Sequence, residues 1–274
     1  MSIDILVITH RWPRYACLSL ETLLESCDDS MRVWIWHNGN DRDTFETARR
    51  FSTHSRVVAF RYSRENVKLR EPTNWMWNHA KGDYLSKVDD DCLVSPHWAQ
   101  TLRRAHEDEP RFGVIGSWRF YDEDYIPDLA EKKIAAYSGG HRIMRNPWVQ
   151  GSGYLMKREC LAQQGLLRKR QSFTNYCLEL ACRGYVNGWY YPFIHEEHLD
   201  DPRSPLSGLS SDEDLLDRLP LSAQSRGITT LEAWTAQMRD FARTVQAADP
   251  EPLNHMSSRQ RARCLLLRRR WRGH

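Results

Sequence analysis

The chain contains no apolar stretch long enough to cross a membrane. None of its apolar runs approaches the ~20 residues that a spanning helix needs. Residues Met1–Ile8 also lack the basic lead-in and the longer apolar part of a secretory signal peptide. We therefore expect these residues to form a first strand and not a targeting segment.

Cysteine is sparse and irregularly placed. The seven cysteines are odd in number and scattered, and no Cys-x-x-Cys pair occurs. This distribution argues against a disulfide framework and favours reduced thiols in a cytosolic compartment. We therefore do not expect cysteine chemistry to carry the function.

The overall composition is that of a polar globular protein. Hydrophobic residues make up 41% of the chain and tryptophan occurs 11 times, while the mean hydropathy is −0.68. A chain of 274 residues suits one α/β domain with an appendage, or two small domains.

The net charge of +3 conceals a basic C-terminus. From His255 onward there is no acidic residue, and seven arginines lie at positions 259, 261, 263, 268, 269, 270 and 272. An Arg-rich helix that also carries Leu265, Leu266 and Trp271 suits a surface of anionic lipid. Contact with nucleic-acid phosphates and a solvated tail are the alternatives, and nucleic acid is the least favoured partner.

The first part of the chain alternates strand-like and helix-like patterns. We expect strands at 4–9, 32–37, 57–62 and 84–88, and helices at 15–26, 43–51 and 75–80. Such alternation predicts an α/β fold with a largely parallel central sheet flanked by helices. In open sheets of this kind, ligands bind beyond the carboxyl ends of the strands.

The second part is less regular. We expect strands at 113–120, 149–156 and 185–194, and helices at 174–183, 212–219, 229–247 and 257–272. Residues 201–211 are rich in Pro, Ser and Gly, which is typical of a linker. The chain is thus divided into an α/β domain at 1–200 and a C-terminal helical appendage at 212–274 with an Arg-rich tail.

Three consecutive aspartates, Asp89, Asp90 and Asp91, follow the apolar segment 84–88. Adjacent carboxylates at a strand end repel one another and are costly to desolvate unless a cation or a ligand neutralises them. In an extended chain Asp89 and Asp91 point the same way and can share one divalent ion. Oxygen ligands favour Mg²⁺ or Mn²⁺, which commonly bridge phosphate oxygens. A solvated acidic turn is the alternative.

Further motifs accompany the aspartates along residues 3–200. They are 7–13 (Val-Ile-Thr-His-Arg-Trp-Pro), 34–41 (Trp-Ile-Trp-His-Asn-Gly-Asn-Asp), Asn66 with Asn74, 80–84 (Ala-Lys-Gly-Asp-Tyr), 151–158 (Gly-Ser-Gly-Tyr-Leu-Met-Lys-Arg) and 183–185 (Arg-Gly-Tyr). In order and spacing this series resembles the family-2-like group of GT-A nucleotide-sugar glycosyltransferases. The resemblance implies a GT-A fold at 1–200, a nucleoside-diphosphate sugar as donor, and Mn²⁺ or Mg²⁺ as cofactor.

The resemblance also implies roles for individual residues. Asp91 would hold the metal, Asp89 would bind the ribose or the same ion, and His198 would be a further ligand with His195 as its rival. The residues implied in nucleotide-sugar binding are Thr9, Arg11, Asn38, Asp41, Asn74, Asp89 and Asp90, and those on the acceptor side are Gly151, Gly153 and Tyr154. His37 stands where the family usually has aspartate, which leaves the nucleobase open.

The catalytic base is the main departure from the family pattern. Where inverting members carry an acidic pair ahead of the Gly-Tyr motif, this chain has Ser172 and Phe173. One explanation is a base from elsewhere, and Glu196 and Asp200 are favoured among the candidates Glu179, Glu196, Glu197, Asp200 and Asp201. A retaining reaction without such a base and an inactive protein are the alternatives.

The expected function is therefore transfer of a sugar to a hydroxyl group of a glycan or lipid-linked acceptor in surface polysaccharide synthesis. A catalytically inactive sugar- or lipid-binding module is one alternative. A sugar-phosphate nucleotidyltransferase is another, although residues 10–14 lack the glycine-rich phosphate loop that it would need. We expect a cytoplasmic protein, or one that is peripheral on the cytoplasmic face of the inner membrane.

Overall fold

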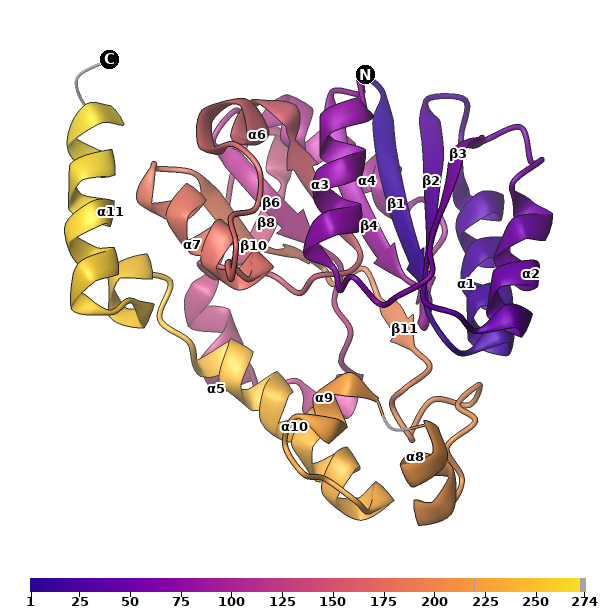
Figure 1. Cartoon of the computed structure of the whole chain (residues 1–274). Coiled ribbons are helices and arrows are strands. Elements are labelled where there is room, and N and C mark those ends of the chain that lie inside the picture. Colours follow the sequence, from indigo (N-terminus) through magenta and orange to yellow (C-terminus); the bar gives the residue numbers. More distant parts are fainter. Residues whose placement is uncertain (219, 272–274) are drawn as a thin grey trace.

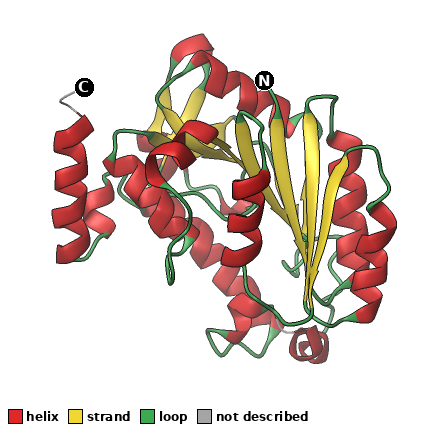
Figure 2. Cartoon of the chain, turned by 45° about the horizontal axis from the view of Figure 1, so that its top comes forward, coloured by secondary structure: helices red, strands yellow, loops and turns green. Residues whose placement is uncertain are grey.

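The structure, a computed structural model, describes residues 1–218 and 220–271. A nine-stranded sheet carries helices on both faces, and a helical C-terminal region lies beside it (Figures 1 and 2). The helices are α1 Pro13–Ser26, α2 Arg42–Phe51, α3 Arg70–His79, α4 Trp98–Asp108, α5 Pro127–Ala130, α6 Arg158–Gln164, α7 Phe173–Cys182, α8 Asp212–Arg218, α9 Leu221–Gln224, α10 Leu231–Ala247 and α11 Ser258–Trp271. The strands are β1 Ile3–Thr9, β2 Met31–Asn38, β3 Val57–Ser63, β4 Tyr84–Asp89, β5 Cys92–Val94, β6 Phe112–Gly116, β7 Ile134–Ala136, β8 Arg142–Arg145, β9 Tyr154–Lys157, β10 Val186–Tyr191 and β11 Glu196–His198.

The large sheet has the strand order β3-β2-β1-β4-β9-β6-β10-β8-β7, and β11 pairs with β5 in a separate two-stranded sheet. The first four strands in this order are parallel, whereas β9 is antiparallel to both of its neighbours. In β1, Ile8 lies opposite Trp36 of β2 and Asp89 of β4. This register brings the carboxyl ends of three strands to one edge of the sheet.

Strand β1 is buried along its whole length because both faces of the sheet are covered. Leu6 and Ile8 belong to the core layer that α3 and α7 share. Ile5 and Val7 belong to the opposite layer, to which α1 and α4 contribute. Burial on both faces explains why the first strand is a continuous apolar run in the sequence.

The α/β fold class is confirmed, but two predicted strands have the wrong extent. The strand predicted at 113–120 ends at Gly116, and the one predicted at 149–156 begins only at Tyr154. Gly153 has φ +59°, a left-handed conformation that a strand cannot contain. The short antiparallel strands β7 and β8 and the helix α4 were not predicted.

The C-terminal region is joined to the α/β domain by packing and hydrogen bonds. Its own small core consists of Leu209, Leu215, Ala223, Trp234 and Met238. Gln246 of α10 accepts a 2.7 Å hydrogen bond from the backbone N–H of Ile126 and donates one of 2.8 Å to the carbonyl of Asp124. No helix within the described residues is both long and apolar enough to span a membrane.

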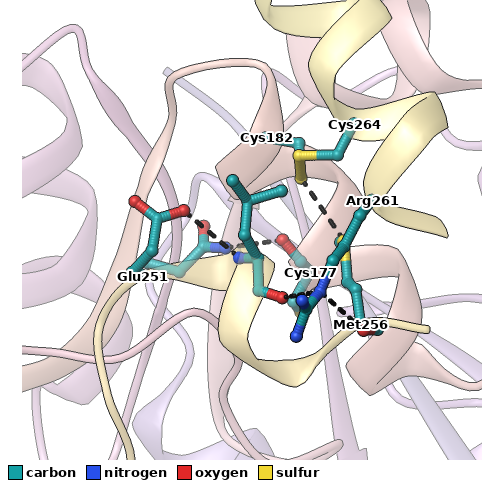
Figure 3. The surroundings of a disulfide bond; sticks show 8 residues. Cys177, Cys182, Glu251, Met256, Arg261 and Cys264 are labelled. Atoms are coloured by element: carbon teal, nitrogen blue, oxygen red, sulfur yellow. Dashed lines mark hydrogen bonds between the residues drawn. A yellow bond between two sulfur atoms is a disulfide. The ribbon is translucent and has the colours of Figure 1, made fainter. Parts of the chain in front are cut away.

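The prediction that all thiols are reduced is wrong for one pair. Cys182 of α7 and Cys264 of α11 form a disulfide (Figure 3). The two cysteines are separated by 82 residues, and their Cα atoms lie 5.3 Å apart because α11 packs against α7. The sequence offered no local spacing that signals this pairing, since a disulfide of this kind depends on tertiary contact.

Candidate active site

Strands β2, β1 and β4 place polar residues at their common carboxyl edge. Asn38 is the last residue of β2, and Asp89 is the last residue of β4. A pocket of about 620 Å³ opens at this edge. It is lined by Ile8, His10, Arg11, Trp12, Asn38, Asn66, Lys68, Leu69, Asp89, Asp90, Asp91 and Asp200, and by Pro220, Leu221 and Ser222 from the C-terminal region.

The first two carboxylates of the triplet are held by groups of the protein itself. Asp89 forms an ion pair with Lys87, and its backbone N–H donates a 3.0 Å hydrogen bond to Ser152 Oγ. Asp90 Oδ2 accepts a 2.6 Å hydrogen bond from the backbone N–H of His10. The pocket edge is therefore fixed by contacts among β1, β4 and the loop that carries Ser152.

The third carboxylate, that of Asp91, lies among like charges. Burial and the negative charges of Asp200 and Asp89 raise its pKa to about 7, although His198 acts in the opposite direction. Carboxylates this close ionise together only if a positive charge offsets their repulsion. A divalent cation would supply that charge, so the residues present fit a metal.

Asp91, Cys92 and His198 form a candidate metal-ligand group. One donor atom of each lies within 4.8 Å of the others. The two-stranded sheet produces this grouping, because His198 of β11 lies opposite Cys92 of β5. The backbone N–H of Leu199 also donates a 2.8 Å hydrogen bond to the carbonyl of Asp91. Cys92 was missed in the sequence, although its position directly after the triplet was an available signal.

His198 is buried between carboxylates. Its Nε2 lies 3.2 Å from Glu196 Oε2, and its Nδ1 lies 3.8 Å from Asp200 Oδ1. Burial and the charge of Arg119 lower its pKa, but the carboxylates of Asp200 and Glu196 outweigh both and raise it to about 9. The imidazole thus already occupies a site that favours positive charge, as a metal site does.

His195, the rival ligand, lies elsewhere. Its side chain is 39% exposed, and its Nε2 lies 2.8 Å from Glu197 Oε2. It does not belong to the ligand group that His198 completes. Among the described residues, the structure therefore supports His198 and not His195 as the histidine next to the aspartates.

Glu196, one of the two favoured bases, is fully buried and engaged. Its carboxylate accepts hydrogen bonds from Ser152 Oγ at 2.7 Å and from Gln150 Nε2 at 2.8 Å. It also contacts His198 and does not line the 620 Å³ pocket. This placement suits a residue that orients His198, and it does not support Glu196 as the base.

Asp200, the other favoured base, lines the pocket. Its Oδ1 has no hydrogen-bond partner among the described residues and lies 3.6 Å from Arg119 Nη2. The backbone carbonyl of Asp200 accepts a 2.7 Å hydrogen bond from Trp234 Nε1 of α10. The C-terminal region thus holds the backbone of this pocket-lining residue in place.

Arg11 and Asn38, predicted to bind the nucleotide sugar, line the pocket. Asn38 Nδ2 donates a 3.0 Å hydrogen bond to Asn66 Oδ1, and Asn38 Oδ1 accepts one of 2.9 Å from the N–H of Val67. The pocket also contains Trp12, an aromatic ring that the prediction of binding residues did not include.

Thr9, Asp41 and Asn74 do not line the pocket, although all three were predicted to bind the donor. Thr9 is buried, with its Oγ1 3.0 Å from His37 Nδ1. Asp41 caps the N-terminus of α2. Asn74 exchanges two hydrogen bonds of 2.9 Å with the backbone of Leu167. These side chains are occupied in supporting the fold around the pocket.

The predicted acceptor-side residues Gly151, Gly153 and Tyr154 lie in and after the loop that precedes β9. A Cβ atom at Gly153 would lie 2.5 Å from Glu196 Oε1, so only glycine fits beside this buried carboxylate. Tyr154 is buried, and its ring stacks on Phe173 with centroids 4.4 Å apart. The tyrosine therefore packs in the core and does not line the pocket.

Comparison with solved structures finds the same fold at low sequence identity. Mannosyltransferase PcManGT from Pyrobaculum calidifontis, in complex with GDP-Man and Mn²⁺, matches with a TM-score of 0.60 and 16% identity, over 96% of this chain and 78% of that chain. TarS 1–349 from S. aureus, in complex with UDP-GlcNAc, matches with a TM-score of 0.56 and 11% identity, over 97% of this chain and 79% of that chain. These likenesses confirm the GT-A fold.

The search of curated proteins gave no significant sequence match. The sequence nevertheless matches the model of a protein family, glycosyl transferase family 2, over residues 4–158. The matched segment is more than half of the 274 residues and includes the aspartate triplet. The chain therefore belongs to glycosyl transferase family 2.

Proposed function

We propose that the chain is a metal-dependent glycosyltransferase that moves a sugar from a nucleoside-diphosphate sugar to a hydroxyl group of a glycan or lipid-linked acceptor. The observation that carries the proposal is the grouping of Asp91 with His198 beside the pocket at the carboxyl edge of the sheet. The nucleotide sugars bound in the two similar solved structures, GDP-Man and UDP-GlcNAc, support the donor class.

The cation, Mn²⁺ or Mg²⁺, would be held by Asp91 and His198, since burial raises the pKa of the Cys92 thiol and hard cations prefer other donors. Asp89 would bind the ribose or the same ion. When bound, such an ion stabilises the negative charge that develops on a departing diphosphate. The Mn²⁺ in the structure of the P. calidifontis mannosyltransferase supports this choice.

The donor would lie in the 620 Å³ pocket. Trp12 offers a ring face for the nucleobase, and Asn38 holds the loop that borders it. Arg11 and Lys68 provide positive charge for the diphosphate on the same wall. The turn of the aspartate triplet borders the same pocket, and the hydrogen bond from the backbone N–H of His10 to Asp90 fixes this turn to the end of β1.

Asp200 would be the base that removes the proton from the acceptor hydroxyl. Asp200 lines the pocket, and Arg119, 3.6 Å from its Oδ1, would keep the carboxylate oriented and charged. Glu196 would position His198 from behind. The acceptor would approach along the loop at Gly151, where a Cβ atom would meet only Lys87, at 3.9 Å.

A catalytically inactive binding module is the second candidate. The observation that favours it is the N-terminus of α7, where Ser172 caps the helix and Phe173 packs on Tyr154, so that no acid is present. The transferase and the binding module are distinguished by incubating the protein with a panel of nucleotide sugars and Mn²⁺, with or without an acceptor, and measuring turnover of the sugar donor. Turnover that EDTA abolishes supports the transferase, whereas binding without any turnover supports the module.

We further propose that α11 contacts an anionic membrane surface. If the acceptor is lipid-linked and serves surface polysaccharide synthesis, this surface is the cytoplasmic face of the membrane. Leu265 and Leu266 support this because they are 50% and 61% exposed. Cys264 faces the protein instead. The side chains of arginines 263, 268, 269, 270 and 272 and of Trp271, which belong to the same prediction, lie outside the described residues.

A further inference from the structure

A second hollow, of about 320 Å³, lies between the loop before α7 and the helix α11. Three of its basic residues, Arg168, Lys169 and Arg170, come from the loop, and Arg259 comes from α11. Glu179 is the carboxylate in the lining, and it is paired with Arg168. The described lining therefore has an excess of positive charge, in contrast to the acidic donor pocket.

The two walls of the hollow are held together covalently. The disulfide between Cys182 and Cys264 joins α7 to α11 (Figure 3), and Cys264 belongs to the lining of the hollow. Arg261 Nε donates hydrogen bonds to the carbonyls of Leu253, at 2.9 Å, and Met256, at 3.0 Å, which fix the start of α11 (Figure 3). The backbone segments that carry the cations are therefore already close together before a ligand binds.

The loop wall contains a polar group without a partner. Gln171 Oε1 accepts a 3.1 Å hydrogen bond from the N–H of Arg168, but the buried Gln171 Nε2 has no hydrogen-bond partner among the described residues. Arg170 has φ +65°, a conformation that L residues adopt at a cost and that is common at ligand sites. A negatively charged oxygen in the hollow would accept a hydrogen bond from Gln171 Nε2 and would offset the positive charge of the basic side chains.

We propose that this hollow binds a phosphate group. Guanidinium groups match the geometry of a phosphate and form strong charge-assisted hydrogen bonds with its oxygens. The site lies outside the lining of the donor pocket, so it goes beyond the proposed function. The phosphate is either the headgroup of an anionic lipid or a soluble phosphate, and the experiment below distinguishes these sources.

The test uses the full chain in EDTA at constant ionic strength, with inorganic phosphate as the probe and ³¹P line broadening as the readout. The hollow variant combines Lys169→Gln, Arg170→Gln and Arg259→Gln. The control variant combines Arg50→Gln, Arg64→Gln and Lys132→Gln, three exposed positions elsewhere that remove the same charge. Phosphate affinity should fall roughly tenfold or more in the hollow variant only, because charge-assisted bonds are lost.

The source of the phosphate follows from co-sedimentation with vesicles of phosphatidylcholine alone or mixed with phosphatidylglycerol. Loss of phosphatidylglycerol-dependent binding in the hollow variant assigns the site to a lipid headgroup, and retained vesicle binding assigns it to soluble phosphate. Mn²⁺-dependent binding of UDP or GDP, which tests the donor site separately, should be equal in all three proteins. Absence of phosphate binding by the unmodified chain, or equal affinity in both variants, overturns the proposal.

Discussion

Asp200 lines the proposed donor pocket, whereas Glu196 is enclosed by hydrogen bonds and does not line it. Asp200→Asn should therefore lower kcat by ~10²-fold or more while donor binding is kept, because a base and not a binding group is lost. Glu196→Gln should instead raise the Mn²⁺ concentration needed for half-maximal rate, since it weakens the orientation of His198. Steady-state kinetics over a Mn²⁺ series measure both effects.

A near-normal kcat for Asp200→Asn would contradict the assignment of the base. A product that retains the anomeric configuration of the donor would do the same, because a retaining reaction needs no such base. The matched control is Asp201→Asn, a buried neighbour that pairs with Arg203 and does not line the pocket.

Single residues of the site could be predicted where a local pattern determines their position. The triplet follows a strand, so the location of Asp91 at the carboxyl edge follows from the sequence alone. Thr9 and Asn74 were predicted to bind the donor but do not line the pocket, and their hydrogen-bond partners, His37 and Leu167, are distant in the sequence. Only tertiary contacts decide whether such a polar side chain faces a ligand or another part of the protein.

Among the elements, α11 is attached to α7 by the disulfide, and this attachment can be measured. Cys264→Ser should lower the free energy of unfolding by about 2–4 kcal/mol, because the crosslink restricts a long loop of the unfolded chain. Denaturant unfolding with and without reductant gives the value, and Cys17→Ser, at a free thiol, is the control. Reductant should bring the unmodified protein to the stability of Cys264→Ser.

Thiol counting checks the same attachment independently. Under denaturing conditions without reductant, alkylation should label five cysteines, those at positions 17, 27, 92, 160 and 177. Labelling of all seven cysteines would contradict the disulfide and restore the original expectation of reduced thiols.

The end of α4 carries an ion pair whose effect on stability depends on pH. Arg111 Nε and Nη2 donate hydrogen bonds of 2.8 Å to the carboxylate of Glu109, and the hydrogen bond with Arg111 is the main cause that lowers the pKa of Glu109 to about 2 from 4.5. Since the pKa is lower in the folded state, the stabilisation is complete above about pH 4.5 and is lost as the pH falls towards 2.

Arg111→Met should therefore lower the free energy of unfolding by ~1 kcal/mol at neutral pH, a modest value because the arginine is largely exposed. The difference from the unmodified protein should shrink markedly near pH 3. Urea unfolding at both pH values measures it, with Arg104→Met as the control on the same helix. A difference that is independent of pH would show that the ion pair is not its source.

Elements could be predicted where a continuous apolar run marks a buried strand or where apolar residues recur at helical spacing. The first strands and the helices α1 and α2 lie within two residues of their expected bounds. The helix α4 was missed, although its buried face includes Trp98, Leu102 and Ala105. The strands β6 and β9 were predicted to be too long because neighbouring apolar residues are buried although they lie outside these strands. Trp118 follows the end of β6 at Gly116, and Val149 precedes the start of β9 at Tyr154.

At the scale of the molecule, the proposed membrane contact depends on the exposed leucines of α11. Leu265→Glu together with Leu266→Glu should release the protein from anionic liposomes, since the apolar contribution to the interface is lost. Transfer to a soluble acceptor mimic should stay near normal, because Cys264 still fixes the helix. Liposome co-sedimentation and the transfer assay measure the two properties.

Val58→Glu together with Leu216→Glu is the matched control, since both side chains are also exposed apolar groups, at 47% and 50%. Liposome binding that is equal in the two double variants would rule out α11 as the membrane contact.

The arrangement of the whole molecule was only partly predictable. The sequence indicates an α/β domain followed by helices, and the structure contains both. The C-terminal region also supplies Pro220, Leu221 and Ser222 to the pocket and a hydrogen bond from Trp234 to Asp200. No spacing in the sequence signals these contacts, because they join segments that approach each other only in the folded chain.

In the proposed function, Asp91 holds a cation to which the donor binds. Thermal unfolding of the unmodified chain with a panel of nucleotide sugars should show stabilisation that requires Mn²⁺, about 2.7 kcal/mol for a donor at 100 times its Kd. Asp91→Asn should abolish this stabilisation and transfer while the protein without metal stays folded, because removing one of several repelling carboxylates does not weaken the fold. Normal Mn²⁺-dependent donor binding and turnover by Asp91→Asn would contradict the account.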